Sequence, residues 1–494
     1  RLVVQLDRPV GGLRLRSATS DVAGEVRRDG TVVFDTHRDL YGRGVRLATA
    51  VYHLDRPGGL SAAAAWRESL PVEMVGEHHR LRILPSQDPA GEIHLGPPRA
   101  DDELGAYGQE RLRSAYAVAQ RPTDPTLWYF ESFAGRSATD TPLAVFDELQ
   151  RHRPDIATVW GVLDHGHWSP PDARRVVIGS SEWYDVLGTA RVLLTNTELE
   201  EWYRRRPDQL VVQCFHGYPS KAMGQSQWRA RALPPRRIAI MRRRSVETWD
   251  LISTPTPEMT EVYREQYGYQ GPAAEHGYPR NDALRSDEAQ AVRDRARRRL
   301  GVRPDQTAVL YAPTWRDDLA TRPRAAAMSD HLDVDAAAAA LGESHVILMR
   351  GHRFHAPGPS RDGVVDVTDH PEINELMLAS DAAVLDYSSL RFDYAQTRQP
   401  MVFLVPDLVD YTSGVRGFLF PFAESAPGPL VRTTDEVVAH MRDVPSLASR
   451  WAGRIADFDA RVNPFQDGHA ASRFLDALEH VGAFGDAERD REVR

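Results

Sequence analysis

Short apolar runs alternate with helical stretches after Pro122, and this alternation restricts the fold more than any other feature of the sequence. The runs have the length of buried strands, and residues 143–151 and 289–300 read as helices between them. Alternation of this kind predicts parallel, doubly wound sheets, because each crossover helix returns the chain to lay the next strand in the same direction. We expect strands at residues 128–130, 157–162, 175–178, 192–194, 210–213, 309–311, 346–349, 383–385 and 401–405.

The region before Pro122 predicts a different architecture. Residues 2–6, 31–34 and 80–84 are short apolar or alternating runs separated by Gly, Pro and Asp turns, a pattern typical of a small β-sandwich or partial barrel. We therefore predict a β-rich accessory domain over 1–122 and two Rossmann-like domains over 123–300 and 301–494, the last with C-terminal helices. Two such halves facing one cleft would bind ligands at the carboxyl ends of their strands.

The composition excludes several classes of protein. With 61 basic and 70 acidic residues the 494-residue chain carries a net charge of −9, so a generally basic nucleic-acid-binding protein is excluded. A single cysteine cannot form an internal disulfide, which favours a reducing compartment. No apolar run approaches the roughly 18–20 residues that span a bilayer.

Two predicted strands lead into polar residues that are suited to catalysis or ligand binding. The strand at 210–213 leads to His216 and Gly217, an imidazole suited to proton transfer and a glycine that lets a ligand approach. A turn histidine with satisfied hydrogen bonds is the alternative. The strand at 309–311 leads to Thr314 and Arg316, a hydroxyl and a guanidinium that suit a phosphate, with a surface ion pair of Arg316 as the alternative.

A third strand, at 383–385, leads to Ser388 and Ser389 at the start of a helix. Such a position either caps the helix or binds an anion through its N–H groups and the helix dipole. His352 follows a further strand, and His355 lies three residues later. Two histidines without a third ligand are weak support for a metal, so no metal site is predicted.

Two other features concern Cys214 and the arginines. Cys214 lies two residues before His216, where a thiol nucleophile is conceivable, but an inert buried cysteine is commoner. Residues 229–244 hold seven arginines and no acid, which favours contact with an anionic polymer or lipid headgroups over a merely solvated face. The arginines assigned to this basic patch are Arg236, Arg237, Arg242, Arg243 and Arg244.

Several segments, taken together, resemble the CDP-glycerol glycerophosphotransferase family of teichoic acid polymerases and primases. They include VVQCFHGYPSKAMG, VLYAPTWRDD and INELMLASDAAVLDYSSLRFDYA, and the resemblance runs in order from about Leu127 to about Asp476. It implies a GT-B architecture and transfer of glycerol phosphate or ribitol phosphate from a CDP-alditol to the hydroxyl of a teichoic-acid-like or capsular polymer, releasing CMP.

The resemblance also implies roles for residues. His216, on the acceptor domain (123–300), would be the general base, and His352 a second catalytic residue. Lys221, the only lysine in the chain, falls on a lysine of the family and with Gly217 would contact the acceptor or a phosphate. The donor domain (301–494) would bind the CDP-alditol through Thr314, Arg316, Arg350, Glu372, Asn374, Ser388, Ser389 and Arg416.

The resemblance implies no required cofactor, although Mg²⁺ could assist the diphosphate. The implied partners are the CDP-alditol, a lipid-linked anionic polymer and the membrane surface, which places the protein in the cytoplasm at the inner face of the membrane. Phe215, Tyr218 and Gly351-His352-Arg353 depart from the family's usual residues beside the reacting groups. The alternatives are a GT-B nucleotide-sugar glycosyltransferase and a non-catalytic protein that binds an anionic polymer.

Overall fold

The computed structural model describes residues 1–5, 11–18, 20–57, 59, 64–88, 91–119, 121–171, 173–314, 331–351, 361–413 and 417–484. The chain divides into two compact units. Unit 1 contains residues 1–138, 155–194 and 199–209, and unit 2 contains residues 139–154, 195–198 and 210–494. The predicted fold class, an α/β chain with parallel sheets preceded by a β-rich region, is confirmed, whereas the domain boundaries at 122 and 300 stay predictions.

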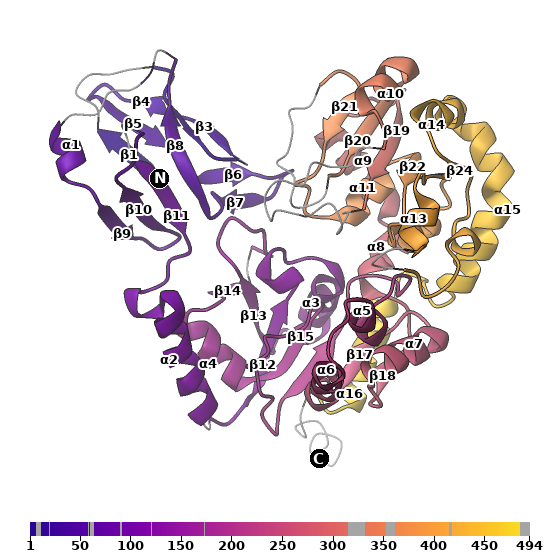
Figure 1. Cartoon of the computed structure of the whole chain (residues 1–494), viewed down its shortest axis with the longest axis horizontal. Coiled ribbons are helices and arrows are strands. Elements are labelled where there is room, and N and C mark those ends of the chain that lie inside the picture. The colour runs from indigo at the N-terminus through magenta and orange to yellow at the C-terminus, as the bar shows by residue number, and fades with distance from the viewer. Residues whose placement is uncertain are drawn as a thin grey trace. The chain divides into compact units, whose positions relative to one another are not determined.

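The N-terminal part of unit 1 is a pair of packed antiparallel sheets (Figure 1). Phe34 of one sheet and Tyr52 and Ile93 of the other are buried in one hydrophobic cluster, as in a β-sandwich. One sheet has the order β1 (Leu2–Gln5), β5 (Thr31–Phe34), β4 (Glu25–Val26). The other has the order β3 (Asp21–Ala23), β2 (Arg14–Arg16), β8 (Ala50–Asp55), β11 (Glu92–Gly96), β10 (Arg80–Leu84), β9 (Val72–Val75). A hairpin, β6 (His37–Asp39) and β7 (Gly44–Arg46), completes it.

The rest of unit 1 is α/β. Strands β12 (Asp124–Glu131), β13 (Ala157–Val162) and β14 (Arg174–Val177) are parallel, and β15 (Ala190–Thr195) follows helix α4 (Ser181–Thr189). The interpretation of residues 1 to about 120 as strands missed helix α1 (Ala64–Glu68) and helix α2 (Gly105–Val118). In α2 the buried residues Gly108, Leu112 and Tyr116 are four apart, which is helical spacing.

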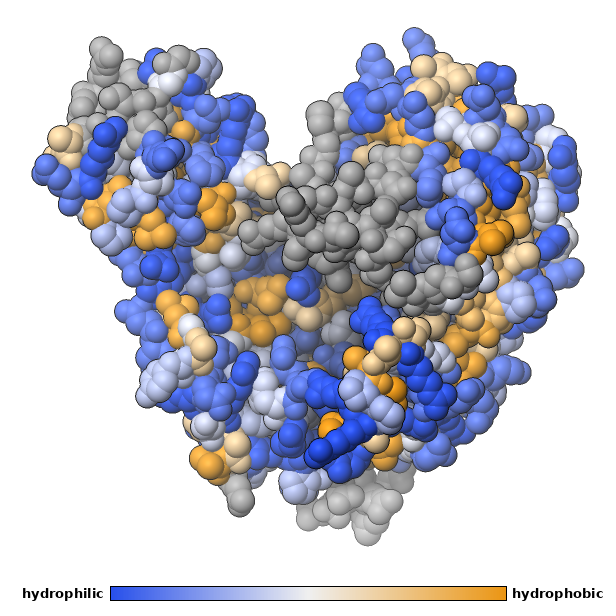
Figure 2. All heavy atoms as spheres, in the orientation of Figure 1, coloured by the Kyte–Doolittle hydropathy of each residue, from blue (hydrophilic) through white to orange (hydrophobic). Residues whose placement is uncertain are grey.

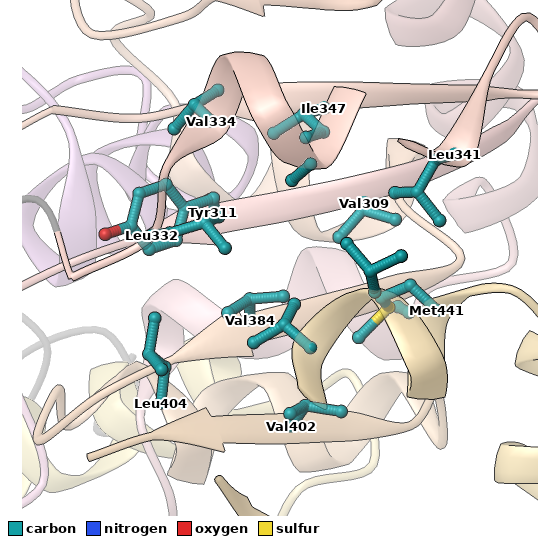
Figure 3. Close-up of a cluster of buried hydrophobic side chains, with 14 of the residues drawn as sticks. Val309, Tyr311, Leu332, Val334, Leu341, Ile347, Val384, Val402, Leu404 and Met441 are labelled. Atoms are coloured by element: carbon teal, nitrogen blue, oxygen red, sulfur yellow. The ribbon is translucent and has the colours of Figure 1, made fainter. Parts of the chain in front are cut away.

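The C-terminal part of unit 2 is a six-stranded parallel sheet that runs β21 (Val364–Asp366), β20 (His345–Met349), β19 (Thr307–Ala312), β22 (Ala382–Leu385), β23 (Met401–Leu404), β24 (Leu430–Val431). Figure 3 shows its core, where Val309 and Ile347 of the sheet lie near Leu341 of α10 (Val334–Leu341) and Met441 of α14 (Thr434–Met441). In chain order the strands read 3-2-1-4-5-6, so the order reverses between β19 and β22. Ligands of such folds bind at the carboxyl ends of the strands at this switch point.

The other strands of unit 2 are β16 (Leu210–Gln213), β17 (Leu251–Ser253) and β18 (Ala273–Ala274), which are parallel. The accompanying helices are α3 (Asp140–His152), α5 (Gly224–Ala230), α6 (Pro235–Thr248), α7 (Pro257–Tyr267), α8 (Asp282–Arg285), α9 (Ala289–Arg299), α11 (Ile373–Ala379), α12 (Leu390–Tyr394), α13 (Leu408–Ser413), α15 (Val444–Val462) and α16 (Ala470–His480). Among the described helices, none combines the length and the apolar character needed to cross a membrane.

Candidate functional site

His216 follows the end of β16, and its ring is oriented by the backbone. Its Nδ1 atom lies 2.8 Å from the carbonyl oxygen of Asn196. Because a carbonyl can only accept a hydrogen bond, Nδ1 carries the hydrogen, and the proton-accepting lone pair of the neutral ring is on Nε2. The ring is exposed. This tautomer is the one that a general base facing a ligand requires.

The backbone around His216 is held in an unusual conformation. Phe215 has φ = 51°, in the left-handed region, and its ring stacks on Tyr263 with centroids 3.9 Å apart. The carbonyl of Gly217 accepts hydrogen bonds from the hydroxyls of Tyr263 at 3.2 Å and Tyr278 at 3.1 Å. The residues on both sides of His216 are therefore fixed, and sequence reasoning did not identify the two tyrosines.

The His216 segment lies against the loop between β22 and α12. A Cβ atom added to Gly217 would lie 3.0 Å from the hydroxyl oxygen of Ser389, so the glycine permits a close approach. Next along the chain, the Tyr218 ring stacks face to face on Phe392, with centroids 4.0 Å apart and planes 6° apart. The structure thus brings His216, Gly217 and Ser389 together within unit 2.

Asp386 joins the ends of β19 and β22 at the switch point. Its carboxylate accepts bonds from the Thr314 amide at 2.8 Å, the Thr314 hydroxyl at 2.6 Å and the Ser388 amide at 3.1 Å. The Thr314 hydroxyl therefore donates its hydrogen to Asp386, and its part in donor binding stays a prediction. Sequence reasoning assigned no role to Asp386, although a carboxyl directly after a buried strand was the available signal.

The loop between β22 and α12, here called the serine loop, carries Ser388 and Ser389, whose side chains make different contacts. Ser388 Oγ accepts a bond from the Leu390 amide at 3.2 Å, which is a capping contact, whereas Ser389 makes no side-chain capping bond. Helix α12 has only five residues, so few peptide dipoles are aligned and the helix dipole contributes less than we expected. Buried Arg391 donates to the Ser388 carbonyl at 2.6 Å and fixes the loop. Burial lowers the pKa of Arg391 to about 9.

Three other predicted donor-binding residues have protein partners. Glu372 accepts from the Asn374 amide at 3.2 Å and caps α11. Asn374 is buried, and its side-chain amide donates to the Arg280 carbonyl. Arg350 donates to the His370 carbonyl at 2.9 Å. Their contact with the donor stays a prediction.

Lys221 lies on a segment that pairs with residues 417–419. The Leu419 amide donates to the Ser220 carbonyl at 3.0 Å, and the Ala222 amide donates to the Gly417 carbonyl at 3.2 Å. The Lys221 ammonium lies 5.8 Å from the centroid of the Tyr411 ring, within cation–π range. Arg316, His352 and Arg416, three further predicted site residues, lie outside the described residues, as does His355.

A buried ionic network holds helix α12, which follows the serine loop. Arg280 Nη2 lies 2.9 Å from a carboxylate oxygen of Asp393 on α12, and Asn281 donates to the same oxygen at 2.7 Å. Asp140 lies 3.8 Å from Arg280 Nη1. Burial by itself would lower the pKa of Arg280, but the Asp393 and Asp140 carboxylates raise it overall. Sequence analysis gave these residues no role, because the pairing joins residues 113 positions apart.

Cys214 has a simple outcome, whereas the candidate metal ligands His352 and His355 lie outside the described residues. Cys214 is fully buried, and burial raises the pKa of its thiol, so the interpretation as an inert core residue is supported. Within the described ranges, no group of three or more His, Cys, Asp or Glu side chains is placed to hold a metal ion.

The predicted basic patch lies mostly on α6. Arg236, Arg237 and Arg243 are exposed, Arg242 donates to Gln225, and Arg243 lies 3.6 Å from Glu247. The apolar residues Ile240 and Val246 of the same helix are 39% and 47% exposed. This helix thus presents arginines together with apolar side chains.

The chain is similar in sequence to known proteins. Residues 114–480 match the family model of CDP-glycerol:poly(glycerophosphate) glycerophosphotransferases. The chain is 27% identical over 379 residues to the teichoic acid glycerol-phosphate transferase of Staphylococcus aureus (strain NCTC 8325 / PS 47), covering 75% of this chain and 97% of that protein. It is 29% identical over 345 residues to the teichoic acid poly(glycerol phosphate) polymerase of Bacillus subtilis (strain 168), covering 68% of this chain but only 46% of that polymerase.

A solved structure has a similar fold. The wall teichoic acid polymerase TagF, soaked with CDPG, superposes with a TM-score of 0.69 at 25% identity, covering 75% of this chain and 93% of the polymerase chain. The likeness supports the predicted GT-B-like architecture. Because the family model covers most of the chain, this protein belongs to the CDP-glycerol:poly(glycerophosphate) glycerophosphotransferase family.

Proposed function

We propose that this chain transfers an alditol phosphate from a CDP-alditol to the hydroxyl of a teichoic-acid-like polymer and releases CMP. Membership of the family and the names of the relatives, which include glycerol-phosphate and ribitol-phosphate enzymes, support this reaction class. The approach of Gly217 to Ser389 at the switch point carries the proposal, because it brings the segment of the proposed base His216 to the loop of the proposed donor site.

In the proposed step, the acceptor hydroxyl oxygen attacks the phosphorus that bears the alditol. The bond from that phosphorus to the bridging oxygen breaks, and CMP leaves with both electrons of that bond. His216 Nε2 takes the hydroxyl proton, while Nδ1–H stays bound to the Asn196 carbonyl. The carbonyl also stabilises the imidazolium that forms, and general-base help of this type contributes about 10²–10⁴-fold.

The leaving CMP gains negative charge, which the C-terminal sheet is proposed to stabilise. The Ser389 hydroxyl and the Lys221 ammonium are proposed to contact it, together with Arg316, His352 and Arg416. Glu372 and Asn374 are proposed to contact the cytidine, and Arg350 and Thr314 the phosphates. Fixed donors aimed at the developing charge need little reorganisation during the reaction.

We propose that no cofactor is required and that Mg²⁺ at most assists the diphosphate. Turnover of the purified chain should therefore persist after treatment with EDTA. Complete loss of turnover, restored by Mg²⁺, would show that the metal is required.

The basic patch on α6 supports the proposed acceptor and the proposed location of the protein at a membrane. Arginines with exposed Ile240 and Val246 on α6 suit an anionic membrane surface, where guanidiniums meet headgroups and apolar side chains enter the interface. In Figure 2 the surface over α6 mixes hydrophilic and hydrophobic residues. We propose that the protein works in the cytoplasm, at the inner face of the membrane, on a lipid-linked anionic polymer.

The deciding experiment measures nucleotide release from several donors. The purified chain is incubated with an acceptor polymer and CDP-glycerol, CDP-ribitol or UDP-sugars. We expect CMP from one or both CDP-alditols and no UDP. Release of UDP instead would indicate a glycosyltransferase, and polymer binding without release of any nucleotide would indicate a non-catalytic binding protein.

A further inference from the structure

We propose that unit 1 carries a phosphate-binding site, formed by Arg46, His78, His165 and Arg175, that holds phosphodiester groups of the anionic acceptor chain. Neither the family resemblance nor the candidate site in unit 2 accounts for this cluster. The identity of the ligand rests on the proposed function, whereas the existence of an anion site rests on the arrangement of the four side chains.

The loop that carries His165 is fixed by its own backbone. It follows β13, and its Asp164 carboxylate accepts hydrogen bonds at 2.8 Å from the amides of Thr49 and Gly166. A Cβ atom added to Gly166 would lie 2.4 Å from Cα of Ala48, so only glycine fits against that strand connection. The position of the loop is therefore set before any ligand binds.

The Asp164 carboxylate in this loop already accepts hydrogen bonds from the backbone. Asp164 is buried, which by itself would raise its pKa, but the nearby His167 ring and the bonds from Thr49 and Gly166 lower it. Asp164 is thus an ionised group whose oxygens are used by the backbone. Its hydrogen bonds stabilise the loop, and within the described residues it forms no ion pair with Arg46 or Arg175.

The four basic side chains gather around this loop. The Arg46 amide donates to the His165 carbonyl at 2.9 Å, and the ring centroids of His78 and His165 lie 5.3 Å apart, edge to face. Arg175 lies on β14, which pairs with β13, and partial burial and the charge of Arg46 lower its pKa. Burial, with the charges of Arg175, His78 and His79, lowers the pKa of His165 to about 4.

These groups lack the anions that would balance them. Within the part of the chain that the structure describes, the side chains of Arg46 and Arg175 form no ion pair or hydrogen bond, and the buried Nδ1 atom of His165 has no hydrogen-bond partner. Glu77 lies 3.6 Å from His78 but is 86% exposed. The donors of the two guanidiniums are therefore available to an anion.

A phosphodiester fits this site better than a lipid surface. Guanidinium groups donate paired hydrogen bonds to phosphate oxygens, and the N–H of a neutral imidazole is a further donor. A flexible chain can bring one phosphate at a time to the two guanidiniums, whereas a flat membrane presents a whole plane of headgroups. The proposed acceptor offers such a group at every repeat.

The test measures binding of poly(glycerol phosphate) to the full chain in phosphate-free buffer without donor, by isothermal titration. We expect Arg46→Gln and Arg175→Gln each to weaken binding at least about tenfold, since each removes charge-assisted hydrogen bonds. Arg174→Gln is the matched control, because this neighbouring arginine on β14 pairs with Glu182 at 2.7 Å. Histidine NMR should show the pKa of His165 rising when the polymer binds.

Equal affinity of both cluster variants and the wild-type chain would overturn the site, as would equal weakening by Arg174→Gln. Retained polymer binding with loss of binding to phosphatidylglycerol vesicles in Arg175→Gln would point to lipid and also overturn it. Polymer binding is measured independently of nucleotide release. Failure to release CMP with intact, Arg175-dependent binding would refute the proposed reaction but leave the phosphate site standing.

Discussion

The tautomer of His216 is the residue-scale feature on which the proposed chemistry depends. Replacing His216 with Gln should lower kcat by about 10²–10⁴-fold, because glutamine cannot take the proton of the acceptor hydroxyl. Binding of the CDP-alditol should change little, since His216 is proposed to act on the acceptor. The measurement is CMP release under saturating donor, with donor affinity determined by titration.

His276→Gln provides a control in a nearly identical local sequence, because His276 begins the second His-Gly-Tyr-Pro of the chain. Its turnover should match that of the wild type. If His216→Gln also turned over normally, His216 would have no part in the mechanism.

A second residue-scale effect concerns pH and Glu131 in unit 1. Glu131 is buried at the end of β12, where it accepts a hydrogen bond from Tyr129, and burial raises its pKa to about 7. The folded state therefore holds a proton that the unfolded state releases above about pH 4.5. Its stabilising contribution is complete below the unfolded pKa and is lost as pH rises through 7.

We expect Glu131→Gln to flatten the fall in stability between pH 5 and 8 while preserving the contact with Tyr129. A shift of this size corresponds to about 3 kcal/mol at most, at 1.36 kcal/mol for each pKa unit. The comparison is of thermal unfolding of the two proteins across this pH range. Parallel curves would show that Glu131 does not titrate in this window.

At the scale of elements, the Arg280–Asp393 pair fastens α12 to the segment that follows β18. Asp393→Asn should destabilise unit 2 by about 3 kcal/mol, because it leaves the buried Arg280 charge with only the more distant Asp140, 3.8 Å away, to offset it. The double variant Arg280→Met/Asp393→Asn should recover part of that loss. Urea unfolding of the single and double variants measures the coupling between the two residues.

Arg243→Ala is the exposed comparison, since its pair with Glu247 is open to solvent. It should cost less than about 1 kcal/mol. Equal costs for Asp393→Asn and Arg243→Ala would mean that the buried pair does not hold α12 in place.

At the scale of the whole molecule, α6 is expected to govern binding to membranes. Replacing Arg236, Arg237 and Arg243 with Gln should weaken binding to anionic vesicles by about 3 kcal/mol, or roughly a hundredfold, at about 1 kcal/mol for each charge. Vesicle sedimentation measures the change. Binding should also fall as salt is raised, because the charges are exposed.

The matched control removes the same charge from α9, through Arg295→Gln, Arg298→Gln and Arg299→Gln, all of which are exposed. This variant should bind vesicles as the wild type does. Equal loss in both variants would mean that net charge, and not α6, drives the association.

Many of the helices and strands, and the polar residues that follow the strands, could be predicted from the sequence alone. The predicted bounds of β5, β10, β13 and β16 matched residue for residue, because short apolar or alternating runs are typical of strands. Helix α2 was missed because its buried residues are sparse among polar ones. His216, Gly217 and Ser389 could be named because their positions after strands are visible in the chain.

The contacts that hold His216, Gly217 and the serine loop in place come from distant segments and are visible only in the folded structure. The Asn196 carbonyl that orients His216 and the two tyrosine hydroxyls on Gly217 come from other segments. Asp386 joins Thr314 to Ser388 only because β19 and β22 are neighbours at the switch point. Local patterns record which side chains must be buried, but hydrogen bonds between distant residues depend on strand order, and one sequence carries no direct record of that order.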